Sequence, residues 1–113
     1  MHELTLANNI LQIINQQAAL QKGGCVREVE VVIGELSGII IEALKAALQA
    51  VIKDTNYENT LFYLREVKAI AKCTNCSAKV NMETLYSQCP QCHNMHLDIM
   101  QGKELFVKSI TFE

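Results

Sequence analysis

The chain has 113 residues, half of them hydrophobic, and a formal net charge of −2. This length fits one domain, or a domain with a small appendage, and the apolar content is sufficient for a core. The absence of a basic run argues against a nucleic-acid partner, which needs a basic face. No stretch resembles a secretory signal peptide or reaches the length of a membrane span, so the sequence predicts a cytoplasmic protein without a membrane partner.

The first predicted element is a helix over residues 4–21. Apolar residues recur at three- and four-residue steps from Leu4 to Ala18, with asparagines and glutamines between them. This pattern is typical of an amphipathic helix. Lys22-Gly23-Gly24 follows, and a cation followed by glycine is a common helix end.

A strand, a second helix and a second strand are predicted next. Residues 26–33 alternate β-branched side chains with glutamates, as in a strand with one solvent face. Ser37 is expected to cap a helix over about residues 39–53, which carries an apolar stripe. Residues 60–71 are rich in β-forming side chains and predict the second strand.

Residues 105–112 predict a closing strand, and they complete the expected fold. Three strands with two helices on one face give a two-layer α/β (α+β) arrangement. The cysteine-bearing segment is inserted between two of these strands. We therefore expect an α/β domain at residues 1–70 plus 98–113 and a metal-binding domain at residues 71–97. The sequence leaves open whether the last strand pairs with the first or the second.

Four of the five cysteines form two CxxC pairs separated by twelve residues: Cys73 with Cys76, and Cys89 with Cys92. Each pair directs two sulfurs at one point, and together they supply the four-thiolate tetrahedron of a structural Zn(II) site. A thioredoxin-type redox pair uses a single CxxC. Iron fits the same tetrahedron, and geometry alone does not separate the two metals. Because the protein fills all four positions and no nucleophile–base pair stands out, the sequence does not predict an enzyme.

The remaining cysteine and two histidines have simpler expected roles. Cys25, at the start of a strand, is expected to be a small buried hydrophobe. His93 directly follows Cys92, where it can donate a hydrogen bond to a cysteine sulfur, replace a lost thiolate or act as a pH-sensitive group. His96 is expected to be exposed to solvent.

The chain begins Met1-His2-Glu3, immediately before the first helix. The α-amine of Met1 and the backbone nitrogen and imidazole Nδ1 of His2 can close two fused chelate rings. Such a nitrogen-rich set suits Ni(II) or Cu(II). A fourth donor can come from Glu3, through its backbone nitrogen or carboxylate, or from another histidine. Glu3 can also simply complement the helix dipole. Taken alone, the triplet favours an ordinary helix start over a metal site.

The combination of motifs resembles the HypA/HybF family of nickel-insertion accessory proteins for nickel–iron hydrogenase maturation. The matching features are the Met-His-Glu start, VVIGELSGI at residues 31–39, the CxxC-x12-CxxCH run at residues 73–93 and the closing strand, which together span the chain. The resemblance implies a nickel-binding α/β domain and a zinc-ribbon-like domain. It implies transient Ni(II) at Met1, His2 and Glu3, structural Zn(II) at Cys73, Cys76, Cys89 and Cys92, and His93 at the position of a family histidine.

The resemblance also implies a function. It is that of a nickel metallochaperone that binds Ni(II) at its N-terminus and delivers it to the hydrogenase large subunit. The implied partners are a nickel-handling GTPase, that large subunit and, in some bacteria, urease maturation proteins. No P-loop sequence occurs in the chain, so a nucleotide-driven step would belong to a partner. Both a monomer and a homodimer are compatible with the sequence. The alternative is a zinc-ribbon protein-interaction module without nickel transfer.

Overall fold

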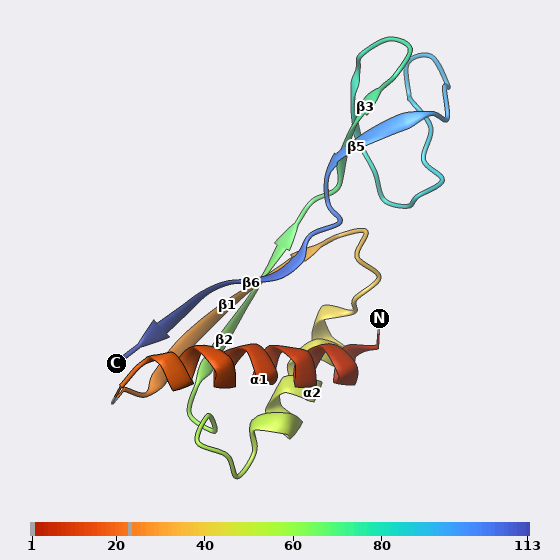
Figure 1. The fold of residues 1–113 in the computed structure, drawn as a ribbon. Coiled ribbons are helices and arrows are strands. Elements are labelled where there is room, and N and C mark those ends of the chain that lie inside the picture. Colours follow the sequence, from red (N-terminus) through yellow and green to blue (C-terminus); the bar gives the residue numbers. More distant parts are fainter. Residues whose placement is uncertain (1, 23) are drawn as a thin grey trace.

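The computed structural model describes residues 2–22 and 24–113 (Figure 1). In chain order, the elements are α1 (Glu3–Leu20), β1 (Val26–Gly34), α2 (Ile41–Ile52), β2 (Leu61–Val67), β3 (Ile70–Cys73), β4 (Lys79–Asn81), β5 (Leu97–Gln101) and β6 (Leu105–Phe112). The sheet β2-β1-β6 and the two helices make up what we call the α/β unit, and the sheet β4-β3-β5 lies in the cysteine unit, residues 69–101. The two units lie end to end in a molecule of 56 × 24 × 16 Å (Figure 1).

Strand β1 is the centre of the larger sheet. It pairs in parallel with β2 and antiparallel with β6. The closing strand therefore pairs with the first strand, which answers the question that the sequence left open. A parallel pair needs a crossover connection, and α2 supplies it between β1 and β2.

The core of the α/β unit lies between this sheet and the two helices. Ile10 and Ile14 of α1, Leu44 and Leu48 of α2, and Val29 of β1 are each at most 2% exposed. Burying one such side chain contributes about 1.5–3 kcal/mol. Both helices cover the same side of the sheet (Figure 1). The predicted two-layer α/β class, with two helices on a three-stranded sheet, is confirmed.

The prediction of a single strand at residues 60–71 is wrong. Strand β2 ends at Val67 and β3 begins at Ile70, in the other sheet. Lys68 and Ala69 carry the chain from one unit to the other. Residues on both sides of this crossing favour strands, so composition alone does not mark the break.

The predicted cap of the second helix is also wrong. The hydroxyl of Ser37 accepts a hydrogen bond from the backbone N–H of Ile39 at 3.3 Å, and α2 begins only at Ile41. Gly38 has a φ of +82°, and Ile40, the residue before the helix, is extended and has no side-chain cap. This turn uses the Ser37 hydroxyl locally and delays the helix.

Cys25 is exposed, so its predicted burial is wrong. Its backbone is fixed by hydrogen bonds with Glu113 at 3.2 and 2.9 Å, and burial in this strand begins only at Val26. Of the described helices, none has the length and apolar character needed to cross a membrane.

Candidate metal centres

The four cysteines of the two CxxC pairs meet at one point of the cysteine unit. Their sulfur atoms all lie within 4.8 Å of one another. The sulfurs of Cys73 and Cys92 are 3.5 Å apart, as are those of Cys76 and Cys89. A tetrahedron with metal–sulfur bonds of about 2.3 Å has sulfurs roughly 3.8 Å apart. The cluster therefore has about the size, and the donor chemistry, that fit zinc binding.

Matching backbone turns form the two halves of this cluster. The N–H of Ser77 donates to the carbonyl of Cys73 at 3.0 Å, and the N–H of His93 donates to the carbonyl of Cys89 at 2.8 Å. Ser77 and His93 both adopt left-handed conformations, with φ of +63° and +61°. Each occupies the place after its CxxC where the chain must turn back. His93 thus has a backbone role that its sequence position did not reveal.

The side chains of His93 and His96 are both exposed. Among the described residues, the group able to hold a metal contains the four cysteines and neither histidine. The amide of Asn94, not a histidine, points a donor at the cluster, with Nδ2 3.7 Å from the sulfur of Cys73. Sequence reasoning missed Asn94, because nothing in the CxxC pattern marks it. A role for His93 as an alternative ligand stays a prediction.

The protonation of the thiols is uneven. The backbone N–H of Cys76 is the main cause that lowers the pKa of Cys73 to about 6, against the opposing effect of burial. The backbone N–H of Cys92 likewise lowers the pKa of Cys89. The N–H of Ala78 lowers the pKa of Cys76, but this effect is outweighed by the hydrogen bond between the Cys76 and Cys89 thiols, with smaller contributions from desolvation and from the thiols of Cys73 and Cys92. Together they raise the pKa of Cys76 to about 12. A bound cation must displace the Cys76 proton, so metal affinity should fall as the pH is lowered.

The apolar core around the cluster is small. It contains Ala69, Ala71, Cys73, Val80, Met82 and Cys89, of which the two cysteines are at most 1% exposed. A unit with so few large apolar side chains depends on another source of stability, and a structural metal supplies it in many small domains.

At the other candidate centre, His2 is the first described residue, and Met1 lies outside the described residues. His2 is the N-cap of α1, and its Nδ1 accepts a hydrogen bond from the backbone N–H of Leu4 at 3.2 Å. The side chain is exposed. The imidazole expected to bind nickel is thus exposed, and its Nδ1 serves as a helix cap.

Glu3 connects this helix start to the second helix. Its Oε2 accepts a hydrogen bond from the backbone N–H of Ile40 at 3.1 Å. That hydrogen bond is the main cause that lowers the pKa of Glu3 from its usual value. The carboxylate lies beside the N-terminus of α2, where a negative charge is favourable. The sequence could not reveal this contact, because the two residues are 37 positions apart.

Comparison with known proteins gives a match over almost the whole chain. A family model described as "Hydrogenase/urease nickel incorporation, metallochaperone, hypA" matches residues 1–112. The hydrogenase maturation factor HypA of Parabacteroides distasonis is 35% identical over 113 residues, which are 100% of this chain and 98% of the relative. The HypA of Azotobacter chroococcum is 34% identical over 100% of both chains.

Solved structures support the fold. The Ni metallochaperone HypA from Helicobacter pylori superposes with a TM-score of 0.65 at 21% identity, covering 97% of this chain and 96% of that one. A second HypA solution structure has a TM-score of 0.67 at 22% identity, covering 97% of this chain and 94% of that one. These likenesses bear on the fold, while the family model and the curated relatives establish the family. The chain belongs to the HypA family of hydrogenase and urease nickel-incorporation metallochaperones.

Proposed function

We propose that this protein binds Ni(II) at its N-terminus and delivers it to the large subunit of a nickel–iron hydrogenase, with structural Zn(II) held by Cys73, Cys76, Cys89 and Cys92. The observation that carries the proposal is the match of residues 1–112 to a nickel-incorporation family. The exposed imidazole of His2 at the start of α1 supports the choice of site.

The proposed nickel donors are the α-amine of Met1, the backbone nitrogen and Nδ1 of His2, and the backbone nitrogen of Glu3. The first N–H groups of a helix have no partner within the helix, so the Glu3 nitrogen can serve without breaking α1. Nitrogen-rich, square-planar sets suit Ni(II). The ion is cargo here, and an exposed site lets a partner reach it.

The helix cap and the proposed nickel site compete for one lone pair. Nδ1 of His2 cannot accept the Leu4 N–H and bind Ni(II) at the same time. A side-chain cap is worth about 1 kcal/mol, so its loss should weaken nickel binding roughly fivefold. Competition of this kind keeps the affinity moderate, which favours release to an acceptor.

We therefore expect Ni(II) to free the Leu4 amide. During a titration followed by NMR, the Leu4 amide resonance should move and its hydrogen exchange should become faster, because its acceptor is withdrawn. A matched titration of His2→Asn, whose side chain caps the helix without an imidazole, should leave the Leu4 amide unchanged. An unperturbed Leu4 amide in nickel-loaded wild-type protein would show that Nδ1 is not a ligand.

Glu3 is expected to bind nickel through its backbone nitrogen. Its carboxylate accepts the Ile40 N–H and so holds the start of α1 against the residue before α2. Glu3→Gln keeps an oxygen that can accept the Ile40 N–H, so its nickel affinity should stay close to that of the wild type. Glu3→Ala loses the contact and should bind nickel several-fold more weakly, by about the worth of one hydrogen bond. Calorimetric titration of both variants checks this, and an equal, large loss in both would make the carboxylate a ligand.

The proposal includes the expected organisation and partners. Residues 1–70 plus 98–113 would form the nickel-binding domain and residues 71–97 the zinc-binding domain. A maturation GTPase would supply the nucleotide-driven step, the large subunit would receive the nickel, and urease maturation proteins would be further partners. The setting would be the cytoplasm, with the protein a monomer or a homodimer, and no nucleic acid or membrane would take part.

The direct test of the site is a Ni(II) titration of zinc-loaded protein with a free α-amine, followed by heat and by the visible d–d band. We expect about one equivalent to bind. A matched protein with an N-terminal extension should lose this binding, because its α-amine is blocked. Equal binding in both would move nickel away from Met1. No binding in either would favour a zinc-ribbon interaction module instead.

A further inference from the structure

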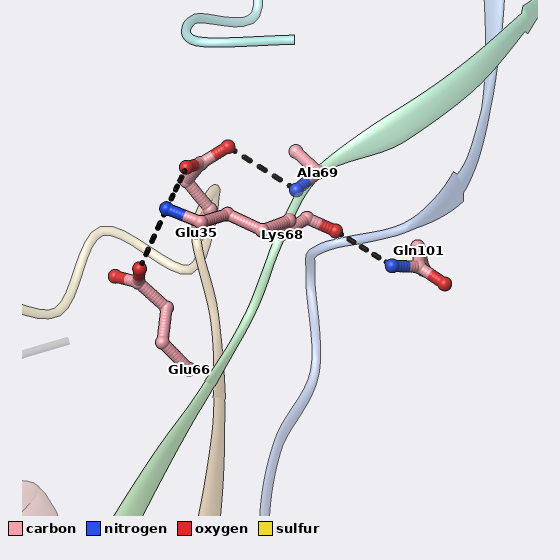
Figure 2. A network of polar contacts seen from close by, with 5 residues as sticks. All are labelled: Glu35, Glu66, Lys68, Ala69 and Gln101. Carbon is pink, nitrogen blue, oxygen red and sulfur yellow. Dashed lines mark hydrogen bonds and ion pairs between the residues drawn. The ribbon is translucent and has the colours of Figure 1, made fainter. Parts of the chain in front are cut away.

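The chain crosses between the two units twice, and both crossings lie against the segment that follows β1. The outgoing crossing is at residues 68–69 and the returning one at residues 102–104. The segment from the last residue of β1 to the residue before α2, residues 34–40, lies beside both, and we call it the β1–α2 loop. Figure 2 shows the side chain of Glu35, on this loop, reaching to the outgoing crossing.

Glu35 uses both carboxylate oxygens at the outgoing crossing. Oε1 accepts a hydrogen bond from the backbone N–H of Ala69 at 3.2 Å, and Oε2 lies 3.5 Å from Nζ of Lys68. The backbone N–H of Glu35 also donates to the carbonyl of Val67 at 2.8 Å. The Glu35 side chain is only 25% exposed. The end of β2 and the first residue of the cysteine unit are therefore held by one residue.

Two carboxylates lie beside the exposed ammonium group of Lys68. Its Nζ lies 3.3 Å from a carboxylate oxygen of Glu66 as well as near Glu35 (Figure 2). The hydrogen bond to Glu66 is the main cause that raises the pKa of Lys68, followed by the charges of Glu66 and Glu35. The carbonyl of Lys68 accepts a hydrogen bond from the side-chain amide of Gln101 at 2.9 Å, which ties the outgoing crossing to the end of β5.

The returning crossing is packed tightly on the same loop. The N–H of Gly34 donates to the carbonyl of Glu104 at 2.6 Å, and the N–H of Leu36 donates to the carbonyl of Gly102 at 2.7 Å. A Cβ atom at Gly34 would overlap the backbone of Gly102, and Gly102 has a φ of +115°. Neither position has room for a larger residue, which is unlike a flexible linker.

The β1–α2 loop also contacts the cysteine unit at one end and the start of α1 at the other. Leu36 packs against the apolar core of the cysteine unit. At the other end, the backbone N–H of Ile40 holds the carboxylate of Glu3. One loop therefore supports both the cysteine unit and the start of α1.

We propose that Glu35 is a positioning residue that locks the cysteine unit and the α/β unit into one rigid body. It acts by joining the β1–α2 loop to the outgoing crossing at Lys68 and Ala69. The start of α1 and the cysteine unit then keep a fixed relative orientation and can be presented together to one partner surface. This inference does not depend on which metal binds at His2.

The test is the relative motion of the two units in the full, zinc-loaded chain. Residual dipolar couplings and ¹⁵N relaxation should give the same alignment and the same rotational diffusion tensor for amides of both units in the wild type. In Glu35→Ala, the cysteine unit should show smaller couplings and faster apparent tumbling than the α/β unit. Zinc content and chemical shifts within each sheet should be unchanged.

Matched variants separate the contacts of Glu35. Glu35→Gln keeps an acceptor for the Ala69 N–H and loses the charge. The difference in alignment and tumbling between its two units should therefore be smaller than in Glu35→Ala. Glu66→Gln, which removes only the other carboxylate beside Lys68, should behave as the wild type. Equal tensors for both units in a folded Glu35→Ala protein would overturn the proposal. Unequal tensors in the wild type would overturn it without any variant.

Discussion

Replacement of Cys73 by serine should release the metal from the cysteine unit and unfold that unit, while the α/β unit stays folded. The Cys73 side chain is 1% exposed, and its sulfur lies 3.5 Å from that of Cys92. Serine removes one of four thiolates and leaves a polar hydroxyl in a small apolar core. Structural zinc sites contribute about 10 kcal/mol or more to folding, which exceeds what the few apolar side chains of this unit supply.

Metal content and an NMR spectrum check this prediction together. Zinc should fall from about one equivalent to near zero, and amide signals of residues 70–101 should collapse to unfolded positions. Cys25→Ser is the matched control, because Cys25 is exposed and lies outside the cluster. It should keep both zinc and spectrum. Retained zinc and an intact second sheet in Cys73→Ser would argue against a cluster that organises the unit.

Replacement of His2 by asparagine should abolish nickel binding without loss of stability. Asparagine is a strong N-cap residue, so it can accept the Leu4 N–H in place of Nδ1. It has no imidazole and cannot complete the proposed chelate. His2→Ala should also lose nickel, and it should cost about 1 kcal/mol of helix stability because the cap is removed as well.

Nickel titration and thermal unfolding of both variants separate the role of His2 as a nickel ligand from its role as a helix cap. His96→Asn is the control for an exposed histidine elsewhere, and it should bind nickel as the wild type does. Wild-type affinity in His2→Asn would remove His2 from the nickel site. A lower melting temperature in His2→Asn would mean that His2 has a structural role beyond the cap.

The elements that local pattern controls were predictable. Periodic apolar residues defined α1, and alternation defined β1 within one residue of its observed end. The breaks that depend on distant contacts were not predictable. The run at residues 60–71 divides at Lys68 and Ala69, where the backbone N–H of Ala69 donates to Glu35, 34 positions earlier in the chain. The start of α2 depends on the turn at Gly38, and Ile40 is held by Glu3 rather than by Ser37.

In the candidate sites, too, the features set by local spacing were predictable and those set by the folded structure were not. The CxxC spacing predicts which sulfurs meet, because each pair is a local turn. The sheet β4-β3-β5 brings the two turns together. The spacing does not reveal Asn94 beside the Cys73 sulfur or the left-handed turn at His93. At the N-terminus, the sequence identified His2 as a possible ligand. Its use as a helix cap depends on the side-chain rotamer, which no spacing rule contains.

Delivery of nickel from this protein to an acceptor can be followed in a transfer experiment. Nickel-loaded, zinc-loaded protein with a free α-amine is mixed with nickel-free hydrogenase large subunit, its maturation GTPase and GTP, in excess chelator that captures any free Ni(II). Nickel should appear in the large subunit despite the chelator, and His2→Asn should transfer none. Nickel that passes entirely to the chelator, with none in the large subunit, would contradict delivery by this protein.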